Sequence, residues 1–200
     1  MQVDVVRTGV RKTMAIVASL ALILALVPSS ALAVSGDTAD TQVQENLIMS
    51  GTWGTCPWEI TADGTLTIHP GTGDDTGGKP PWDGEYSLFT RVVFAQEGDS
   101  KVIAPADSSS LFVLASQIDS IDLSGLDTSK VENMSGMFDS CRTLTAVDLS
   151  GLDLSRVTDM GSMFTDCSSL GSLDFSNHHL SQLTSISKAF SNCSSLASVD

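Results

Sequence analysis

The sequence predicts an α/β solenoid, a stack of strand-plus-helix units, with a small β-rich cap at its N-terminal end. From residue 118 onward the chain repeats itself every 26 residues. Within each repeat, the spacing of the apolar residues changes from the period of a strand to that of a helix. A hairpin pattern with tryptophans nearby precedes the repeats and supplies the expected cap.

The first 33 residues have the pattern of an export signal. Arg7, Arg11 and Lys12 precede an apolar run, Met14 to Val27, and Ala31-Leu32-Ala33 matches a signal-peptidase site. The run is shorter than the roughly 20 apolar residues of a membrane-spanning helix. We therefore expect cleavage after Ala33, a secreted protein at the cell surface, and no membrane span in the mature fragment.

The mature chain is strongly acidic. Residues 34–200 hold 23 acidic and seven basic residues, a formal charge of −16, against −14 for the whole sequence. This charge disfavours nucleic-acid binding, which depends on neutralising phosphates. It favours a polar or basic partner instead.

A linker and a cap are expected before the repeats. Residues 34–50 are small and polar without periodicity, which predicts a flexible linker and ordered structure from near Gly51. Residues 51–91 form the expected β-rich cap. An apolar–polar alternation predicts a hairpin around Ala62-Asp63-Gly64, and Phe89 to Phe94 resumes as a strand. One hairpin face would carry Trp58, Ile60, Leu66 and Ile68, and the tryptophans Trp53, Trp58 and Trp82 lie where the first repeat needs cover.

The repeat solenoid is expected to span residues 92–200. Its units are a degenerate one at about 92–117, clear ones at 118–144, 145–170 and 171–196, and a truncated next unit that Asp200 ends. Equivalent positions carry the strand residues Ile121, Val147, Leu173 and Val199, the phenylalanines Phe112, Phe138, Phe164 and Phe190, and the cysteines Cys141, Cys167 and Cys193. A fragment of a longer repeat array is therefore expected.

Each unit is predicted to hold one short strand and one short helix. Ile121 and Leu123 have strand spacing, whereas the later apolar residues of the unit, Val131, Met134, Phe138 and Cys141, follow helical spacing. Ser129 and Glu132 match a capping box at the start of that helix. One unit cannot offset the entropy of ordering its residues, so the units must stack. We expect the strand side of the stack to be concave.

A resemblance to a known family becomes specific in the repeats. The phrases VTDMGSMFTDCSSL and VDLSGLDLS closely resemble the repeat of the BspA-type leucine-rich repeat surface proteins, over about residues 118–200, and the GTLTI strand of the cap is also similar. The resemblance implies a cell-surface solenoid used for attachment to host or neighbouring-cell components. The third repeat departs from the pattern at His178-His179, Ile186 and Ala189, which leaves the turn around His178 in doubt.

Catalysis and cofactor binding are disfavoured. The Gly73 to Lys79 run has phosphate-loop spacing, but Pro80 replaces the magnesium-binding hydroxyl residue, so we expect no nucleotide site. The cysteines lie too far apart in sequence for a zinc site. Cys141, Cys167 and Cys193 are expected to be free thiols, and Cys56 has no obvious partner. We expect no metal, no cofactor and no enzyme activity.

The candidate binding residues form one row. The strand alternation places Asp122, Asp148 and Asp174, together with Ser124, Ser150 and Ser176, on the outer face of the sheet. Two interpretations stay open: these carboxylates bind local amides and hydroxyls, or they form an acidic recognition face. The function expected is an exported, adhesin-like protein that binds an extracellular protein or glycan. The alternative is a passive spacer or stalk that displays another domain.

Overall fold

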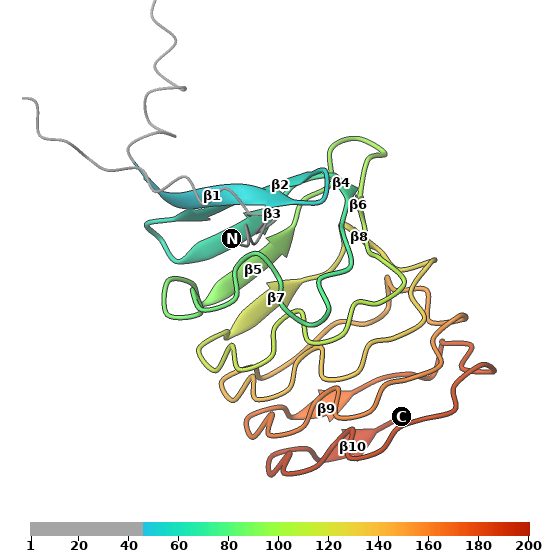
Figure 1. Cartoon of the computed structure of the whole chain (residues 1–200). Coiled ribbons are helices and arrows are strands. Elements are labelled where there is room, and N and C mark those ends of the chain that lie inside the picture. The colour runs from blue at the N-terminus through green and yellow to red at the C-terminus, as the bar shows by residue number, and fades with distance from the viewer. Residues whose placement is uncertain (1–45) are drawn as a thin grey trace, which may run out of the picture.

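The computed structural model describes residues 46–200, so the export signal and most of the predicted linker lie outside the described residues. The chain winds into a solenoid of stacked coils, with β1 at one end and β10 at the other (Figure 1). The strands are β1 (Leu47–Trp53), β2 (Cys56–Thr61), β3 (Thr65–Ile68), β4 (Gly71–Thr72), β5 (Arg91–Phe94), β6 (Val102–Ile103), β7 (Ser120–Asp122), β8 (Leu126–Asp127), β9 (Ser172–Leu173) and β10 (Ser198–Val199). No helix occurs among these residues.

The N-terminal end is a pair of antiparallel hairpins. β2 and β3 pair around the predicted turn, with Ile60 opposite Leu66 and Trp58 opposite Ile68, and all these side chains are buried. This confirms the predicted hairpin and its apolar face. β1 adds to the outer edge of β2 and begins at Leu47, so ordered structure starts earlier than Gly51, inside the range predicted as linker.

The coils then stack in parallel along separate lines. The first sheet continues from the hairpins through β5 to β7, in the order β1-β2-β3-β5-β7, and β9 pairs with β10 further along. The second line is the sheet β4-β6-β8. The third is a run of single parallel bridges that joins Asp107, Asn133, Asp159 and Ser185. Each coil therefore contacts only its neighbours, as in a solenoid.

The predicted helices are wrong: the fold is a β-solenoid rather than an α/β solenoid. The segment expected as a helix after Ser129 is a succession of turns. The capping box is absent as well, because the Ser129 N–H donates to Asp127 Oδ1, and the Glu132 carboxylate pairs with Arg156 of the next coil at 2.7 Å.

Hydrogen bonding between coils explains why turns replace the helix. In the second clear repeat, the amides of Met160, Ser162, Phe164 and Asp166 donate to carbonyl oxygens of the next coil. The residues between them close turns, as Met163 does onto the Met160 carbonyl. An α-helix would direct these same donors along its own axis. Serine, threonine, asparagine, aspartate and glycine are frequent here, and these residues favour turns over helices.

The distance between successive coils also favours turns over a helix. Packed helices lie about 8–10 Å apart, whereas paired strands lie about 4.8 Å apart. The rings of Phe112, Phe138, Phe164 and Phe190 stack with centroids 5.4 to 6.3 Å apart. The side opposite the strands thus repeats at nearly the strand spacing. The strand side was expected to be concave because a parallel sheet would curve less freely than a helical side, and residues 46–200 form no helical side.

The phenylalanine stack continues into the cap through Trp82. Its ring stacks on Phe112 at 5.7 Å and an interplanar angle of 13°, and Trp53 and Trp58 contact it edge-on. The Trp82 Nε1 group donates to the Leu111 carbonyl at 2.8 Å. The tryptophans are therefore the side chains that close the N-terminal end of the core.

A row of thiols runs beside the rings. Each thiol donates to a carbonyl of the preceding coil: Cys141 to Phe112, Cys167 to Phe138 and Cys193 to Phe164, at 3.3, 3.1 and 2.9 Å. All these cysteines and Cys56 are free, as predicted for the repeats, although helix spacing was the wrong reason.

Candidate functional site

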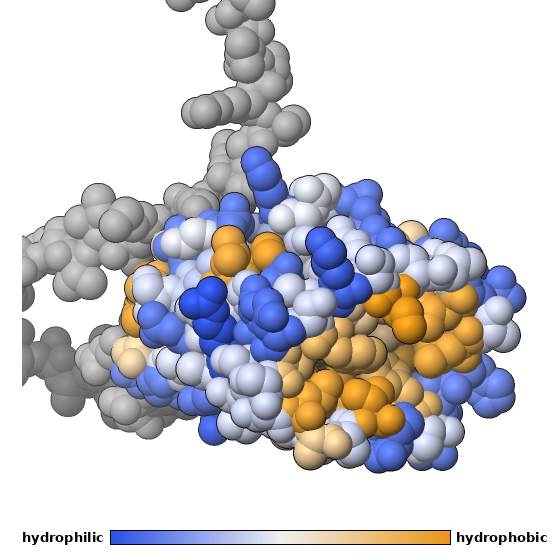
Figure 2. All heavy atoms as spheres, turned by 90° about the horizontal axis from the view of Figure 1, so that it is seen from below, coloured by the Kyte–Doolittle hydropathy of each residue, from blue (hydrophilic) through white to orange (hydrophobic). Residues whose placement is uncertain are grey.

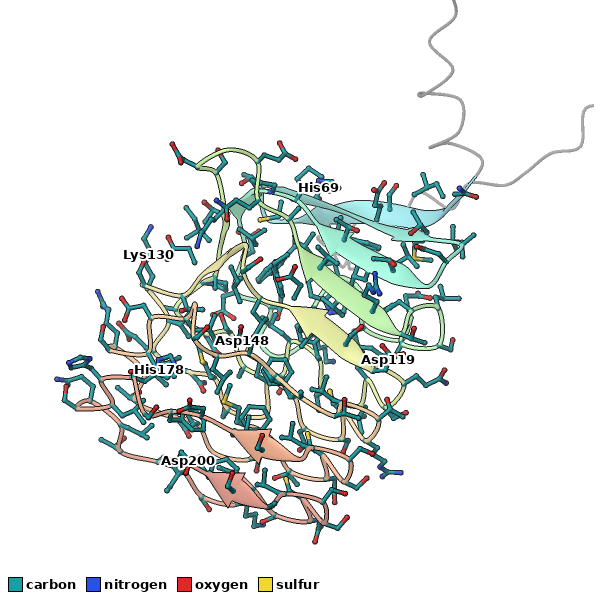
Figure 3. All side chains as sticks on the ribbon, turned by 180° about the vertical axis from the view of Figure 1, so that it is seen from behind. His69, Asp119, Lys130, Asp148, His178 and Asp200 are labelled. Carbon is teal, nitrogen blue, oxygen red and sulfur yellow. The ribbon has the colours of Figure 1, made fainter. Side chains whose placement is uncertain are left out.

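The predicted row of aspartates and serines lies on one exposed side of the stack. Asp122, Asp148 and Asp174 and their serines Ser124, Ser150 and Ser176 are all exposed. Asp148 lies midway down the stack and Asp200, which ends the row, lies in the lowest coil (Figure 3). We call these aspartates and serines the Asp–Ser row.

Shallow hollows separate the members of the row. One, of about 120 Å³, lies between the first two clear repeats and is lined by Asp122, Asp148 and both of their serines. The next, of about 80 Å³, is lined by Asp148, Asp174, Asn177 and His178. The variant repeat therefore brings a histidine to the side of the row. The same polar edge recurs from coil to coil, each time with a carboxylate on both sides of a hollow.

Each carboxylate of the row also closes a local turn. The Oδ1 atoms of Asp122, Asp148 and Asp174 accept the amide of the serine two residues on, at 2.9, 2.9 and 2.8 Å. Ser176 also donates its hydroxyl to Asp174. Of the two interpretations left open, the local hydrogen bonds are therefore present. The bonds that close the turns are all accepted by the Oδ1 atoms, and the side chains remain exposed to solvent.

The local hydrogen bonds also set the charge of the row. Hydrogen bonding by Ser150 lowers the pKa of the Asp148 carboxyl, and hydrogen bonding by Ser176, with a smaller effect of nearby His178, lowers that of Asp174. Both side chains are exposed, so desolvation opposes these shifts only weakly. These carboxylates are ionised at neutral pH.

Sequence reasoning missed two further rows of the same turn. Asp127 and Asp153 accept the amides of Ser129 and Ser155 on the second side of the stack. On the third side, the acceptors are Asp107, Asn133 and Asp159, and the donors are the amides of Ser109, Ser135 and Gly161. The signal was an aspartate or asparagine two residues before a serine or glycine at three positions of the repeat, which is typical of such turns.

The other histidine, cysteine and acidic side chains of residues 46–200 form no candidate metal site. Among residues 46–200, no three histidine, cysteine, aspartate or glutamate side chains are placed to hold a metal ion. His69 of the cap lies between Glu59 and Glu97, at 3.6 and 3.4 Å. The same stretch of chain has no helix that could cross a membrane.

One sequence family matches the coils. Residues 106–199 are similar to a family described as Mycoplasma protein of unknown function, DUF285. The match covers the three clear repeats and the end of the degenerate one, and the cap lies outside it. No curated protein and no solved structure is significantly similar to the chain.

Proposed function

We propose that this chain is an exported, adhesin-like binding protein of the cell surface, which uses its solenoid to bind macromolecules of a host or a neighbouring cell. The observation that carries the proposal is the Asp–Ser row, with its hollows of about 120 and 80 Å³ between successive coils. The resemblance of the repeats to BspA-type leucine-rich repeat surface proteins and the export-signal pattern of residues 1–33 support it.

The chemistry of the row favours a polar or basic partner. The pKa of Asp148 and that of Asp174 are lowered, so these two carboxylates are ionised at neutral pH, and residues 34–200 carry a formal charge of −16. An exposed charge pair contributes little by itself, about 0–1 kcal/mol. Repetition along the stack makes such contacts useful, because a partner held at one coil meets the next at high effective concentration. An extracellular protein or glycan with regularly spaced basic or hydroxyl groups fits this description.

The test is to replace Asp122, Asp148 and Asp174 together by asparagine. Asparagine keeps the local turn, because Asn133 already accepts the Ser135 amide at 2.9 Å in the equivalent turn of the third side. The substitution removes charge and leaves the shape unchanged. Beads coated with the variant should attach to cultured host cells several-fold less than beads coated with the parent chain, with a weaker dependence on salt. The melting temperature should stay nearly unchanged.

A matched triple alanine variant separates binding from folding. Alanine removes the charge and the turn hydrogen bond together, so it should lower the melting temperature as well as attachment. If the asparagine variant attaches like the parent while both variants lose stability, the row is structural. The alternative function, a spacer or stalk that displays another domain, would then be favoured, and binding would have to be sought on the cap.

Export is tested separately. Cleavage after Ala33 predicts that the N-terminal sequence of the secreted protein begins at Val34. A secreted protein that begins at Met1 would contradict the export signal.

A further inference from the structure

A hollow on the second side of the stack is larger than those beside the Asp–Ser row. Its volume is about 460 Å³, within the range of small-molecule sites. It is lined by residues of β4, β6 and β8 and by those that precede β4 and β6: Pro70, Gly71, Thr72, Asp99, Ser100, Lys101, Ile103 and Asp127. Figure 2 shows hydrophobic side chains gathered around a hollow of about 210 Å³ in the last coil, whereas charged and hydroxyl side chains line this one. We call it the second-side hollow.

An insertion builds one wall of the second-side hollow. Val93 of β5 and Ile103 of β6 are ten positions apart in the chain. Their partners in the next coil, Asp122 and Asp127, are only five positions apart. The five additional residues belong to the loop 95–101, which stands out from the stack beside β4 and β6 (Figure 1). In repeat proteins such insertions map to loops on one face, which is often the binding face.

The inserted loop is held in place before any ligand binds. The Glu97 amide donates to the Ser100 carbonyl and the Ser100 amide to the Glu97 carbonyl, both at 3.0 Å. The Glu97 carboxylate also lies 3.4 Å from Nδ1 of His69, which follows β3. Asp99 lies between the two paired residues and reaches the hollow from this loop. A wall that is already ordered lowers the entropic cost of binding.

The backbone around the second-side hollow is paired, so a peptide strand cannot add there. The Gly71 amide donates to the Lys101 carbonyl at 3.3 Å. The outer edge of β4 is occupied as well, since the Thr72 amide donates to Thr55 Oγ1 at 2.8 Å and the Thr55 amide to the Thr72 carbonyl at 2.9 Å. Strand addition needs an exposed sheet edge. A ligand of the hollow must therefore be held by side chains.

The charges around the second-side hollow disfavour a charged ligand. Hydrogen bonds from Ser129, with smaller effects of Lys101 and Lys130, lower the pKa of the Asp127 carboxyl, which is therefore ionised at neutral pH. The two lysines balance the charges of Asp99 and Asp127. An anion would lie against carboxylates, and a cation would lie against ammonium groups. An uncharged ligand whose groups both donate and accept hydrogen bonds avoids this conflict.

We propose that the second-side hollow binds an uncharged saccharide unit of a glycan. A hydroxyl group both donates and accepts, so neighbouring hydroxyls of one sugar can donate to Asp99 or Asp127 and accept from Lys101. The aliphatic surfaces of Ile103 and Pro70 fit the C–H face of a sugar ring. The proposal rests on the adhesin-like function, of which a glycan is one of the two partner classes. It uses a different surface, because the hollow shares no residue with the Asp–Ser row.

An array of neutral oligosaccharides, with sialylated and sulfated forms of the same chains, tests the class of ligand. The full chain should bind neutral members that share a terminal sugar and should bind their acidic forms more weakly. Calorimetry with the soluble form of the strongest neutral ligand should give 1:1 binding. Diglycine, which carries an ammonium and a carboxylate group, should not compete.

A matched pair of variants locates the site. Asp127 and Asp153 occupy equivalent positions of successive coils, and each accepts the amide of the serine two residues on at 2.9 Å. Only Asp127 lines the hollow. Asp127→Asn should weaken saccharide binding by roughly tenfold, because a charge-assisted hydrogen bond is lost, and Asp153→Asn should leave binding unchanged. Lys101→Met keeps the length of the side chain, removes the ammonium group and should weaken binding by a similar factor.

The triple asparagine variant of the Asp–Ser row separates this proposal from the test of cell attachment. It should bind the saccharide like the parent chain, whether or not its attachment to cells falls. Loss of saccharide binding in that variant would place the site on the row and overturn the proposal. Absence of binding to every neutral glycan, stronger binding of the acidic forms, competition by diglycine, or equal affinities of the Asp127→Asn and Asp153→Asn variants would overturn it as well.

Discussion

The two ends of the solenoid have the same structural requirement, and within residues 46–200 only the N-terminal end meets it. A coil presents an aromatic ring and a row of backbone hydrogen-bonding groups to its neighbour. At the N-terminal end, Trp82 stacks on Phe112 and donates to the Leu111 carbonyl, so one side chain replaces both a ring and an amide of a missing coil. At the other end, Phe190 and the amides beside it stay uncovered within the described residues. A stack of coils therefore needs a cap with aromatic area and a hydrogen-bond donor.

The largest expected effect comes from removing that cap residue. Trp82→Ala should lower the free energy of unfolding by about 3–5 kcal/mol, because Trp82 is fully buried against rings on both sides. Phe190→Ala at the open end should cost clearly less, since Phe190 is only half-buried and has a stacked ring on one side alone. Chemical denaturation of both variants measures the difference.

Trp82→Phe provides the control. Phenylalanine keeps an aromatic ring but loses the Nε1 donor, which leaves the buried Leu111 carbonyl without that partner. Its loss should be smaller than that of the alanine variant. Equal losses at Trp82 and Phe190 would show that the two ends do not differ.

The reactivity of the cysteine thiols compares the packing inside the stack with that of its last coil. Burial raises the pKa of the Cys56 thiol to about 11 and that of Cys167 to about 12, and raises that of Cys141 as well. Burial also raises the pKa of Cys193, but this thiol lies in the last coil and is only half-buried. Iodoacetamide at pH 8 should therefore label Cys193 first, by roughly tenfold, since only the accessible thiolate reacts. Mass spectrometry of the native protein measures the order, and equal labelling of Cys141 would contradict closed packing.

A smaller effect is expected at the turns that replace the helix. Two positions of each repeat have a positive φ, and one of them is held by Leu114, Ser140, Asp166 and Asn192 in successive coils. Leu114 has a φ of 66° and is 64% exposed. Its backbone conformation is therefore strained, and its side chain gains no burial in return. Leu114→Asn should raise the stability by about 1 kcal/mol, because asparagine tolerates this conformation better.

Gly136→Ala is the matched opposite change. Gly136 has a φ of 61°, and an added Cβ would lie 3.3 Å from Ser110 Oγ. This variant should lose about 1–2 kcal/mol. Thermal and denaturant unfolding of the two variants test the sign at each position, and a stabilising Gly136→Ala would contradict the turn geometry.

The smallest effect should come from acid, which acts on the sides of the stack rather than on its ends. Hydrogen bonds from the following serines lower the pKa of Asp127, Asp148, Asp153 and Asp174. A lowered folded-state pKa gives stability that is present above the unfolded value of about 3.9 and is lost as pH falls through the folded value. The melting temperature should be flat from pH 7 to 5 and fall below pH 4. A variant with Asp148 and Asp174 replaced by asparagine should show a shallower fall.

Much of the architecture could be predicted from local pattern. The 26-residue period, the hairpin around Asp63 and the buried face of Trp58 all follow from residues that neighbour one another in sequence or recur at a fixed spacing. The repeat cysteines are free, as expected, but the helix spacing from which this was predicted is absent. The aspartates and serines of the Asp–Ser row are exposed, and their role in binding stays a prediction. The two further rows were missed because their turns fall where a helix was expected.

By itself, the sequence determined that the chain repeats, which side chains face inward, and where a cap is needed, because apolar spacing and period are visible in the order of residues. Only the tertiary structure decided between helix and turn. The spacing of Met134, Phe138 and Cys141 fits either, and the choice depends on whether the Met134 and Phe138 amides find acceptors within the segment or on the next coil. Stacking at the strand distance supplies those acceptors from residues 25 positions further along the chain, such as Asp159 for Met134, and no local pattern reveals them.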